Sequence, residues 1–213
     1  MKTKIGFKET LEWYEQNAKT YAQKIADKPD LFLLERFIKK LPVEGKILDA
    51  GSAGGRDCKI FAQNGFQPTG IDAVKALVEE AKTKNPDIDF IHGNFTSLPF
   101  KDNSFDGIWA NASLLHLENI EDMKKSLSEF FRVLKKSGIA HISVKKQLGK
   151  EKTSNVAQEY SSDFDRFFRW FTKDELIQLI EEAGFKIVQF DDDYTPKDGR
   201  KNIKWLAALA KKV

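Results

Sequence analysis

The sequence is poor in several features that would restrict its class. One cysteine, Cys58, among 213 residues excludes an internal disulfide and a cysteine-based zinc site. The longest stretches without a charged residue, 60–71 and 107–117, span twelve and eleven residues, whereas a membrane-spanning helix needs about 20 apolar residues. The opening MKTKIGFKETLEWYEQ lacks the apolar core of a secretory signal. We therefore expect a cytoplasmic protein without a membrane partner.

Charge of one sign is not in excess either. The 35 basic and 32 acidic residues leave a net charge of +3, too little to require a nucleic-acid partner by charge alone. The three histidines, His92, His116 and His141, are far apart in the sequence and form no HxH or HxxxH pattern. No metal site is therefore expected.

Short apolar runs alternate with longer amphipathic ones, which predicts an α/β fold with a mostly parallel sheet and helices on both faces. We expect strands at 46–49, 68–72, 89–92, 105–110, 139–144, 185–190 and 203–210. Helices are expected at 10–26, 30–41, 57–64, 74–84, 120–134 and 173–183. The loop between the last two strands is too short for a crossover helix, so the last strand should be antiparallel. Residues 1–213 then form a single domain.

Two local signals refine this prediction. Thr172 can cap the helix at 173–183 while Glu175 reaches back to complete a capping box, and Gly184 ends the helix. Residues 146–171 carry few aliphatic side chains and end in the aromatic and basic phrase DFDRFFRWF. An insertion of this length is often a substrate lid, although its aromatic residues could equally cover the sheet edge.

The stretch most informative about chemistry is ILDAGSAGGRD at 47–57, where the first strand ends and a helix begins. Small residues allow a tight turn close to a ligand, and the helix N-terminus offers free N–H groups to an anion. The dinucleotide fingerprint needs glycines at 51, 53 and 56, which read Gly, Ala and Arg, and no Gly-Lys-Ser/Thr follows. A nucleotide-type pocket is indicated, and an oxidoreductase is disfavoured.

Two further positions fit such a pocket. Asp72 ends the second strand, where a carboxylate can accept both ribose hydroxyls of an adenosine. Asn94 and Phe95 follow the third strand, where the amide could bind an adenine edge and the backbone of Phe95 a ring nitrogen. Each signal alone is weak, because an aspartate after a strand is more often a turn former, but their order and spacing are informative.

With these residues in place, the sequence resembles the class I S-adenosylmethionine-dependent methyltransferases over 14–209. DAGSAGGRD resembles the first motif of the family, and LPFKDNSFDGIWANASLLHL its fourth-strand motif. FFRVLKKSGIAHISVK and FTKDELIQLIEEAGFKIV resemble the regions that follow. Ala53 replaces a glycine and Asn94 a more usual aspartate. These departures should narrow the turn and alter adenine recognition without changing the fold.

The resemblance implies a three-layer Rossmann-like sandwich of seven strands, the last antiparallel, with the N-terminal helices of 1–42 closing over S-adenosyl-L-methionine. Arg56 would lie near the methionine carboxylate of the cofactor, although an exposed helix-start arginine is nearly as plausible. The implied cofactor site consists of Tyr14, Tyr21, Asp49, Gly51, Ser52, Ala53, Gly55, Arg56, Asp72, Ala73, Asn94, Phe95, Asn111 and Ala112.

The acceptor of the methyl group is less well defined by the sequence. His116 follows the fourth strand and is the candidate general base, with a packing role the equal alternative. A cationic, aromatic mouth suited to an anionic or ring-bearing small molecule is expected from Lys145, Arg166, Arg169, Trp170 and Arg200. The alternatives are a tRNA methyltransferase of the wobble-uridine type, whose C-terminal region has a comparable phrase, and a non-catalytic interaction module that retains the fold.

Overall fold

The structure, a computed structural model, describes residues 6–156, 166–196 and 203–213. Its centre is a seven-stranded sheet in the order β3-β2-β1-β4-β5-β9-β8. The strands are β1 (Lys46–Ala50), β2 (Gln67–Asp72), β3 (Asp89–His92), β4 (Phe105–Asn111), β5 (Leu134–Lys145), β8 (Phe185–Tyr194) and β9 (Trp205–Lys212). β9 runs antiparallel to both of its neighbours, β5 and β8, and the other neighbouring pairs of this sheet are parallel. The predicted sheet with its antiparallel last strand is confirmed.

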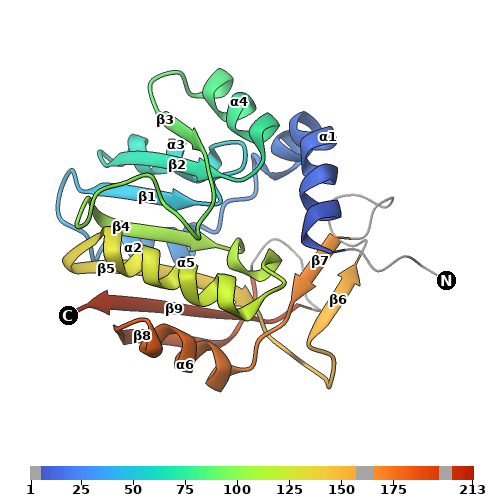
Figure 1. Cartoon of the computed structure of the whole chain (residues 1–213). Helices are drawn as coiled ribbons and strands as arrows, with labels where there is room; N and C mark the ends of the chain where they lie inside the picture. Colours follow the sequence, from blue (N-terminus) through green and yellow to red (C-terminus); the bar gives the residue numbers. More distant parts are fainter. Residues whose placement is uncertain (1–5, 157–165, 197–202) are drawn as a thin grey trace.

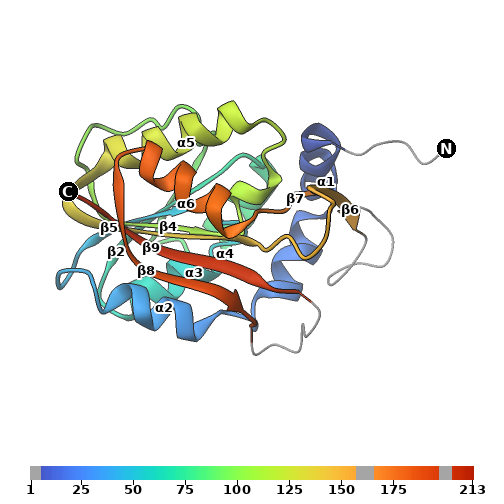
Figure 2. The same ribbon diagram turned by 90° about the horizontal axis from the view of Figure 1, so that it is seen from below.

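Helices cover both faces of this sheet. They are α1 (Phe7–Ile25), α2 (Leu31–Ile38), α3 (Arg56–Gln63), α4 (Lys75–Lys84), α5 (Ile120–Val133) and α6 (Lys173–Glu182). Figure 2 shows α5 and α6 on one face and α2 and α3 on the other. Neighbouring residues of β4 divide between the two cores, Ile108 packing toward α5 and Trp109 toward α2 and α3. The strand is therefore apolar on both sides, as a doubly covered sheet requires.

Two strands extend beyond the apolar runs that predicted them. β5 begins at Leu134 and passes through two lysines before the buried run, because Leu134 pairs with Phe105 across a register shift in β4. β8 continues through three aspartates to Tyr194, which pairs with Trp205 of β9. Backbone pairing carries both strands through residues whose side chains have no apolar pattern.

The predicted start of α6 is half confirmed. The backbone N–H of Glu175 donates to the Oγ1 of Thr172 at 3.2 Å, so the cap is present. The carboxylate of Glu175 does not complete the capping box, because it accepts a 2.5 Å hydrogen bond from the Nη2 of Arg169 instead. Gly184 follows the helix with a φ of 96°, the left-handed conformation that suits glycine after a helix.

Residues 146–171 contain a second, two-stranded antiparallel sheet of β6 (Thr153–Val156) and β7 (Arg166–Arg169). It lies beside α1, beyond the carboxyl ends of β1 and β4 (Figure 1). The N–H of Phe167 donates to the Oγ1 of Thr10 at 2.9 Å, and Gln147 and Phe171 are joined by a 2.8 Å backbone bond. The predicted lid is thus fixed at both ends and along β7, and its opening and closing stay a prediction.

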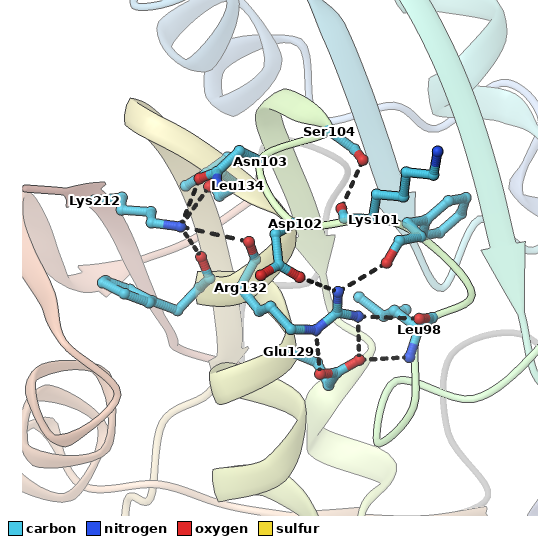
Figure 3. A network of polar contacts seen from close by, with 11 residues as sticks. Leu98, Lys101, Asp102, Asn103, Ser104, Glu129, Arg132, Leu134 and Lys212 are labelled. Atoms are coloured by element: carbon cyan, nitrogen blue, oxygen red, sulfur yellow. Dashed lines mark hydrogen bonds and ion pairs between the residues drawn. The ribbon is translucent and has the colours of Figure 1, made fainter.

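The opposite end of the sheet is closed by a polar network around Arg132 (Figure 3). Its guanidinium binds Glu129 through Nε and Nη2, each at 2.7 Å, and Asp102 at 2.8 Å. It also donates to the carbonyl oxygens of Phe100 and Leu98. The loop before β4 is therefore fastened to α5 far from the carboxyl ends of the strands.

Candidate functional site

A pocket opens where the carboxyl ends of β1, β2, β4 and β5 meet α1 and β7, with about 190 Å³ of space open to water. It is lined by most of the site residues predicted from the sequence: Tyr14, Tyr21, Asp49, Gly51, Ser52, Ala53, Arg56, Asp72, Ala73, Asn94, Phe95, Asn111, Ala112, His116, Lys145 and Arg166. These residues are up to 152 positions apart, as in the contact between Tyr14 and Arg166. Their roles stay predictions.

The glycine turn forms the floor of the pocket. Gly51 has a φ of 93°, and an added Cβ would lie 2.4 Å from the Cβ of Ser113. A Cβ on Gly54 would lie 2.5 Å from the Cβ of Ala22, so this glycine lets α1 approach the turn. Ala53, which replaces a family glycine, adopts a φ of 46°. The small residues are therefore explained by backbone conformation and by close packing.

Asp72 fixes the turn from the end of β2. Its Oδ2 accepts the N–H of Ala53 and its Oδ1 the N–H of Val74, both at 2.9 Å. Each carboxylate oxygen keeps a further lone pair for a hydroxyl group. Asn94 accepts the N–H of Thr96 through its Oδ1 at 3.1 Å, and its amide NH₂ stays on an exposed side chain at the pocket.

The part of the pocket formed by β1, β2 and the turns after them, which we call the cofactor half, carries the carboxyl groups of Asp49, Asp57 and Asp72, and Asp57 is paired with Arg56. Burial, followed by the charge of Asp57, raises the pKa of Asp49 well above its usual range. Burial also raises the pKa of Asp57, but Arg56 and the indole N–H of Trp109 outweigh it and hold that pKa low. Of this pair, Asp49 is the carboxyl group that binds its proton more tightly, and Asp57 is the one whose charge Arg56 stabilises.

The cofactor half fits S-adenosylmethionine. The side-chain hydroxyls of Ser52 and Ser113 are buried and have no hydrogen-bond partner within the described ranges, and both residues line the pocket. Buried polar groups are normally paired. Two orphaned hydroxyls beside the glycine turn, with a carboxyl group on either side of it, suit a ligand rich in hydroxyl and charged groups.

Arg56 lines the pocket, and its guanidinium is bound by neighbouring residues, so its role at the cofactor carboxylate stays a prediction. Its Nε and Nη2 bind the two oxygens of Asp57 at 2.7 and 2.9 Å, and its Nη1 donates to the carbonyl oxygens of Ile25 and Lys28. Every nitrogen of the guanidinium is already engaged. Arg56 therefore ties α3 to the end of α1, and a bidentate bond to the cofactor carboxylate would require it to leave Asp57.

The other part of the pocket, which we call the acceptor half, is formed by α1, η1 (Leu114–His116), the ends of β5 and β9, and β7. The Nη1 of Arg166 donates to the Oη of Tyr14 at 2.6 Å, and the Oη of Tyr14 lies 3.4 Å from the Nε2 of His116. The Nδ1 of His116 lies 3.0 Å from the carbonyl oxygen of Phe167. Because only a protonated Nδ1 can donate to that carbonyl, Nε2 carries the free lone pair.

Burial, opposed by the Phe167 carbonyl and helped by Arg166 and Lys145, lowers the pKa of His116 to about 3. The imidazole is therefore neutral and is a much weaker base than histidine in water. Burial likewise raises the pKa of Tyr14 well above 10, so its phenol is neutral. His116 has the position that a general base needs, and its basicity is the property that an experiment has to test.

Lys145 ends β5 and contributes a second basic side chain to the acceptor half. It is buried, with its Nζ 3.7 Å from the ring centre of Phe168 and 6.0 Å from that of Trp205. Phe168 and Trp205 both line the pocket, as does Leu115. The acceptor half thus combines two basic groups with an aromatic and aliphatic wall.

Three predicted residues that the structure describes do not line the pocket. Arg169 pairs with Glu175 at the start of α6, which draws its guanidinium away. Trp170 follows β7, and its backbone N–H donates to the carbonyl oxygen of Lys152. Gly55 has a φ of 78° and supports the turn against Phe90. Arg200 lies outside the described residues.

Sequence reasoning missed part of the lining. Ser113 stands within the quoted phrase NASLLHL, and Thr10 lies four residues before Tyr14 on the same helical face, so local signals existed for both. Trp205 and Tyr194 had none, because only the pairing of β8 with β9 brings them to the pocket. Further lining residues are Phe7, Leu11, Ile25, Lys28, Asp30, Leu33, Asp57, Val74, Leu77, Leu115, Leu117, Ser143, Phe168 and Pro196.

Comparison with known proteins agrees with this architecture. A family model described as a methyltransferase domain matches residues 48–142. Two demethylmenaquinone methyltransferases are similar in sequence: that of Renibacterium salmoninarum is 36% identical over 44% of this chain and 38% of its own length. That of Paenarthrobacter aurescens is 30% identical over 68% of this chain and 64% of its own length. The chain thus spans less than two thirds of these relatives.

A solved structure has the same fold. The 1,6-didemethyltoxoflavin-N1-methyltransferase of Burkholderia thailandensis, with S-adenosylhomocysteine bound, has a TM-score of 0.72 at 22% identity and covers 97% of this chain and 87% of its own. Residues 48–142 match a methyltransferase domain and the chain has the fold of a known methyltransferase, so the Rossmann-like fold and the resemblance to class I S-adenosylmethionine-dependent methyltransferases predicted from the sequence are confirmed. In the parts of the chain that the structure describes, no helix has the length and apolarity needed to cross a membrane.

Proposed function

We propose that this protein transfers a methyl group from S-adenosyl-L-methionine to a small-molecule acceptor. The observation that carries the proposal is the cofactor half: a glycine turn, Asp72 bonded to that turn, and two orphaned serine hydroxyls in one pocket. Similarity to methyltransferases of small molecules supports the acceptor class. A tRNA acceptor, the alternative from the sequence, is tested alongside it.

The residues of the cofactor half would hold the cofactor by complementary charge. Asp72 accepts the ribose hydroxyls, Asn94 and the backbone of Phe95 bind adenine, and Asp49 faces the cofactor's ammonium group. When bound, S-adenosylmethionine supplies a methyl group on a positively charged sulfur. Positioning an acceptor in line with such a methyl group can lower the activation free energy by about 7–11 kcal/mol through orientation alone.

The remaining residues act on the acceptor and on water. Tyr14 and His116 form a neutral, hydrogen-bonded wall opposite the glycine turn. The segment 146–171, anchored through β7, closes over this wall and excludes water from the transfer. If the acceptor has to lose a proton, the Nε2 of His116 is the atom that takes it.

Calorimetry with purified protein tests the proposal. S-adenosylhomocysteine is expected to bind with a micromolar dissociation constant and NAD not to bind. Asp72→Asn should weaken S-adenosylhomocysteine binding by about 10- to 100-fold, the scale of hydrogen bonds to a charged group. Arg132→Gln, in the network at the far end of the sheet, is the matched control and should bind normally. An unchanged affinity of the Asp72 variant would remove that residue from the site.

The acceptor class is tested with labelled S-adenosylmethionine, offered with pools of small molecules and with total tRNA. Label in the small-molecule pool supports the proposal. Label in tRNA alone would replace it with the nucleic-acid alternative. Binding of S-adenosylhomocysteine without transfer to either pool would favour a non-catalytic module that retains the fold.

A further inference from the structure

Arg166 is the most unusual charged residue of the pocket. It is the first residue of β7, a strand that lies beside α1 (Figure 1), and it is only 4% exposed. No carboxylate of the described residues forms an ion pair with it, and its Nε is buried without a hydrogen-bond partner among them. A buried charge of this kind is expensive unless something pairs with it.

The groups that do surround Arg166 are neutral. The Oη of Tyr14 accepts a hydrogen bond from its Nη1, and the rings of Trp13, Tyr14, Tyr21 and Phe168 lie 5.3–5.8 Å from its Cζ. Aromatic faces favour a cation without neutralising it. The guanidinium is thus held in place by rings and a phenol, while its charge is left for another partner in the pocket.

Lys145 adds to the same positive region. Its Nζ lies over the Phe168 ring that Arg166 also faces, and both basic side chains act on His116. All pocket-lining carboxyl groups that the structure describes, Asp30, Asp49, Asp57 and Asp72, lie instead at the N-cap of α2 or on β1, α3 and β2. Lys28 and Arg56 also line that part of the pocket, and Arg56 is paired with Asp57. The described carboxyl groups are thus separate from the elements that supply Arg166 and Lys145.

We infer that the methyl acceptor is a small organic anion whose charged group binds Arg166, with its apolar body against Phe168, Leu115 and Trp205. This inference rests on the proposed function and names the substrate class for it. A carboxylate is the chemistry that best matches the guanidinium, because its two oxygens can accept two parallel N–H bonds. The wall of aromatic and aliphatic side chains favours an acceptor with a ring.

An anionic acceptor also suits the neutral state of its neighbours. If the anionic oxygen is the attacking atom, its lone pair forms the new bond to the methyl carbon while the carbon–sulfur bond breaks and leaves its pair on sulfur. The products are a methyl ester or ether and a neutral thioether, so no proton has to be removed. A weakly basic His116 is compatible with such a reaction, whereas an acceptor that must lose a proton requires a stronger base at this position.

The competing interpretation is that Arg166 binds the carboxylate of the cofactor itself, since Tyr14 and Tyr21 lie beside it. The two roles differ in what the loss of Arg166 removes. An acceptor role leaves cofactor affinity intact. A cofactor role lowers the affinity for S-adenosylhomocysteine but leaves unchanged that for 5′-methylthioadenosine, which lacks the amino-acid carboxylate.

The experiment is calorimetry on the full chain saturated with S-adenosylhomocysteine. The probes are matched pairs of an acid and its neutral amide: benzoate with benzamide, and 1-naphthoate with 1-naphthamide. At least one acid is expected to bind ten-fold or more tightly than its amide. Arg166→Gln should remove this preference, Arg166→Lys should restore part of it, and Arg132→Gln should leave it unchanged. Retained affinity for S-adenosylhomocysteine shows that each variant is folded.

Three results would overturn the inference. Acids that bind no better than their amides, including no binding by either, remove the anionic acceptor while S-adenosylhomocysteine binding still supports the proposed function. A preference for acids that survives in Arg166→Gln places the anion elsewhere. A loss of S-adenosylhomocysteine but not of 5′-methylthioadenosine affinity in Arg166→Gln assigns the residue to the cofactor. Failure of the wild-type protein to bind S-adenosylhomocysteine would instead contradict the proposed function.

Discussion

The two halves of the pocket are built in different ways. The cofactor half comes from β1, β2 and the turns after them, and its main polar contacts join side chains to backbone N–H groups, as between Asp72 and Ala53. The acceptor half is assembled from α1, η1, β5, β7 and β9, and its contacts join side chains far apart in the sequence, as between Arg166 and Tyr14. Local motifs define the first half, and tertiary packing defines the second.

The halves also differ in charge, and this difference matches their proposed ligands. S-adenosylmethionine carries a sulfonium and an ammonium group against one carboxylate, so a half lined by Asp49 and Asp72 complements it. The acceptor half presents Arg166 and Lys145. A cationic donor at one end and an anionic acceptor at the other would bring opposite charges together at the point of transfer.

The largest expected effect comes from a substitution that strains the glycine turn of the cofactor half. Gly51→Ala adds a Cβ that would lie 2.4 Å from the Cβ of Ser113, at a φ of 93° that an alanine rarely adopts. Strain and overpacking together should lower the free energy of unfolding by about 2–4 kcal/mol. Chemical denaturation measures the loss, and S-adenosylhomocysteine affinity should fall with it.

Gly149→Ala is the control for this substitution, because an added Cβ there has no neighbour within 4 Å. Its stability should stay within about 0.5 kcal/mol of the wild type. Equal stability of the two variants would mean that the turn adjusts freely, and the close approach of Gly51 to Ser113 would then have no role in shaping the pocket.

The same contrast explains what could be predicted from the sequence. The glycine turn, Asp72 and Asn94 lie within short stretches whose residue types already indicate a nucleotide pocket, and the structure places them around one cavity. The alternation of apolar runs was enough for the sheet and its helices, because burial on both faces leaves a continuous apolar signal in each strand.

Partner choice is what the sequence could not supply. Arg56 and Arg169 were both available for ligands by residue type, yet Asp57 engages one and Glu175 the other. Arg166, from the same aromatic phrase as Arg169, instead enters the pocket because β7 packs on α1 through Thr10. Which arginine has no acidic partner among the described residues depends on tertiary contacts between segments that have no shared local pattern.

A pH-dependent effect is expected from Asp49. Burial, and then Asp57, raises its pKa in the folded protein, so the folded state holds this proton more tightly than the unfolded chain does. Its contribution to stability is therefore present below the unfolded value of about 4 and is lost as the pH rises through the raised value. Asp49→Asn removes that loss, and the variant should gain stability relative to the wild type as the pH rises.

Denaturation curves for both proteins across the pH range measure this difference. Glu129→Gln is the control, because hydrogen bonds from Arg132 hold the pKa of Glu129 low. This variant should show the opposite trend and lose stability relative to the wild type as the pH rises above the carboxyl range. A difference between wild type and Asp49→Asn that does not change with pH would contradict the raised pKa of Asp49.

The smallest effect concerns the one position where the glycine turn departs from its family. Ala53 adopts a φ of 46° while its N–H binds Asp72. The left-handed conformation costs a non-glycine residue about 1–2 kcal/mol, which a glycine avoids. A glycine in turn costs about 0.5–1 kcal/mol, because its unfolded chain has the larger entropy. Ala53→Gly should therefore stabilise the protein by about 0.5–1 kcal/mol, and S-adenosylhomocysteine affinity should stay within about twofold because the N–H is kept.

Ala62→Gly, on the exposed face of α3, is the control and should be destabilising by a similar amount. Destabilisation by Ala53→Gly would show instead that the Ala53 methyl group, which packs in the cluster of α1 and α4 side chains, contributes more than the strain of its backbone.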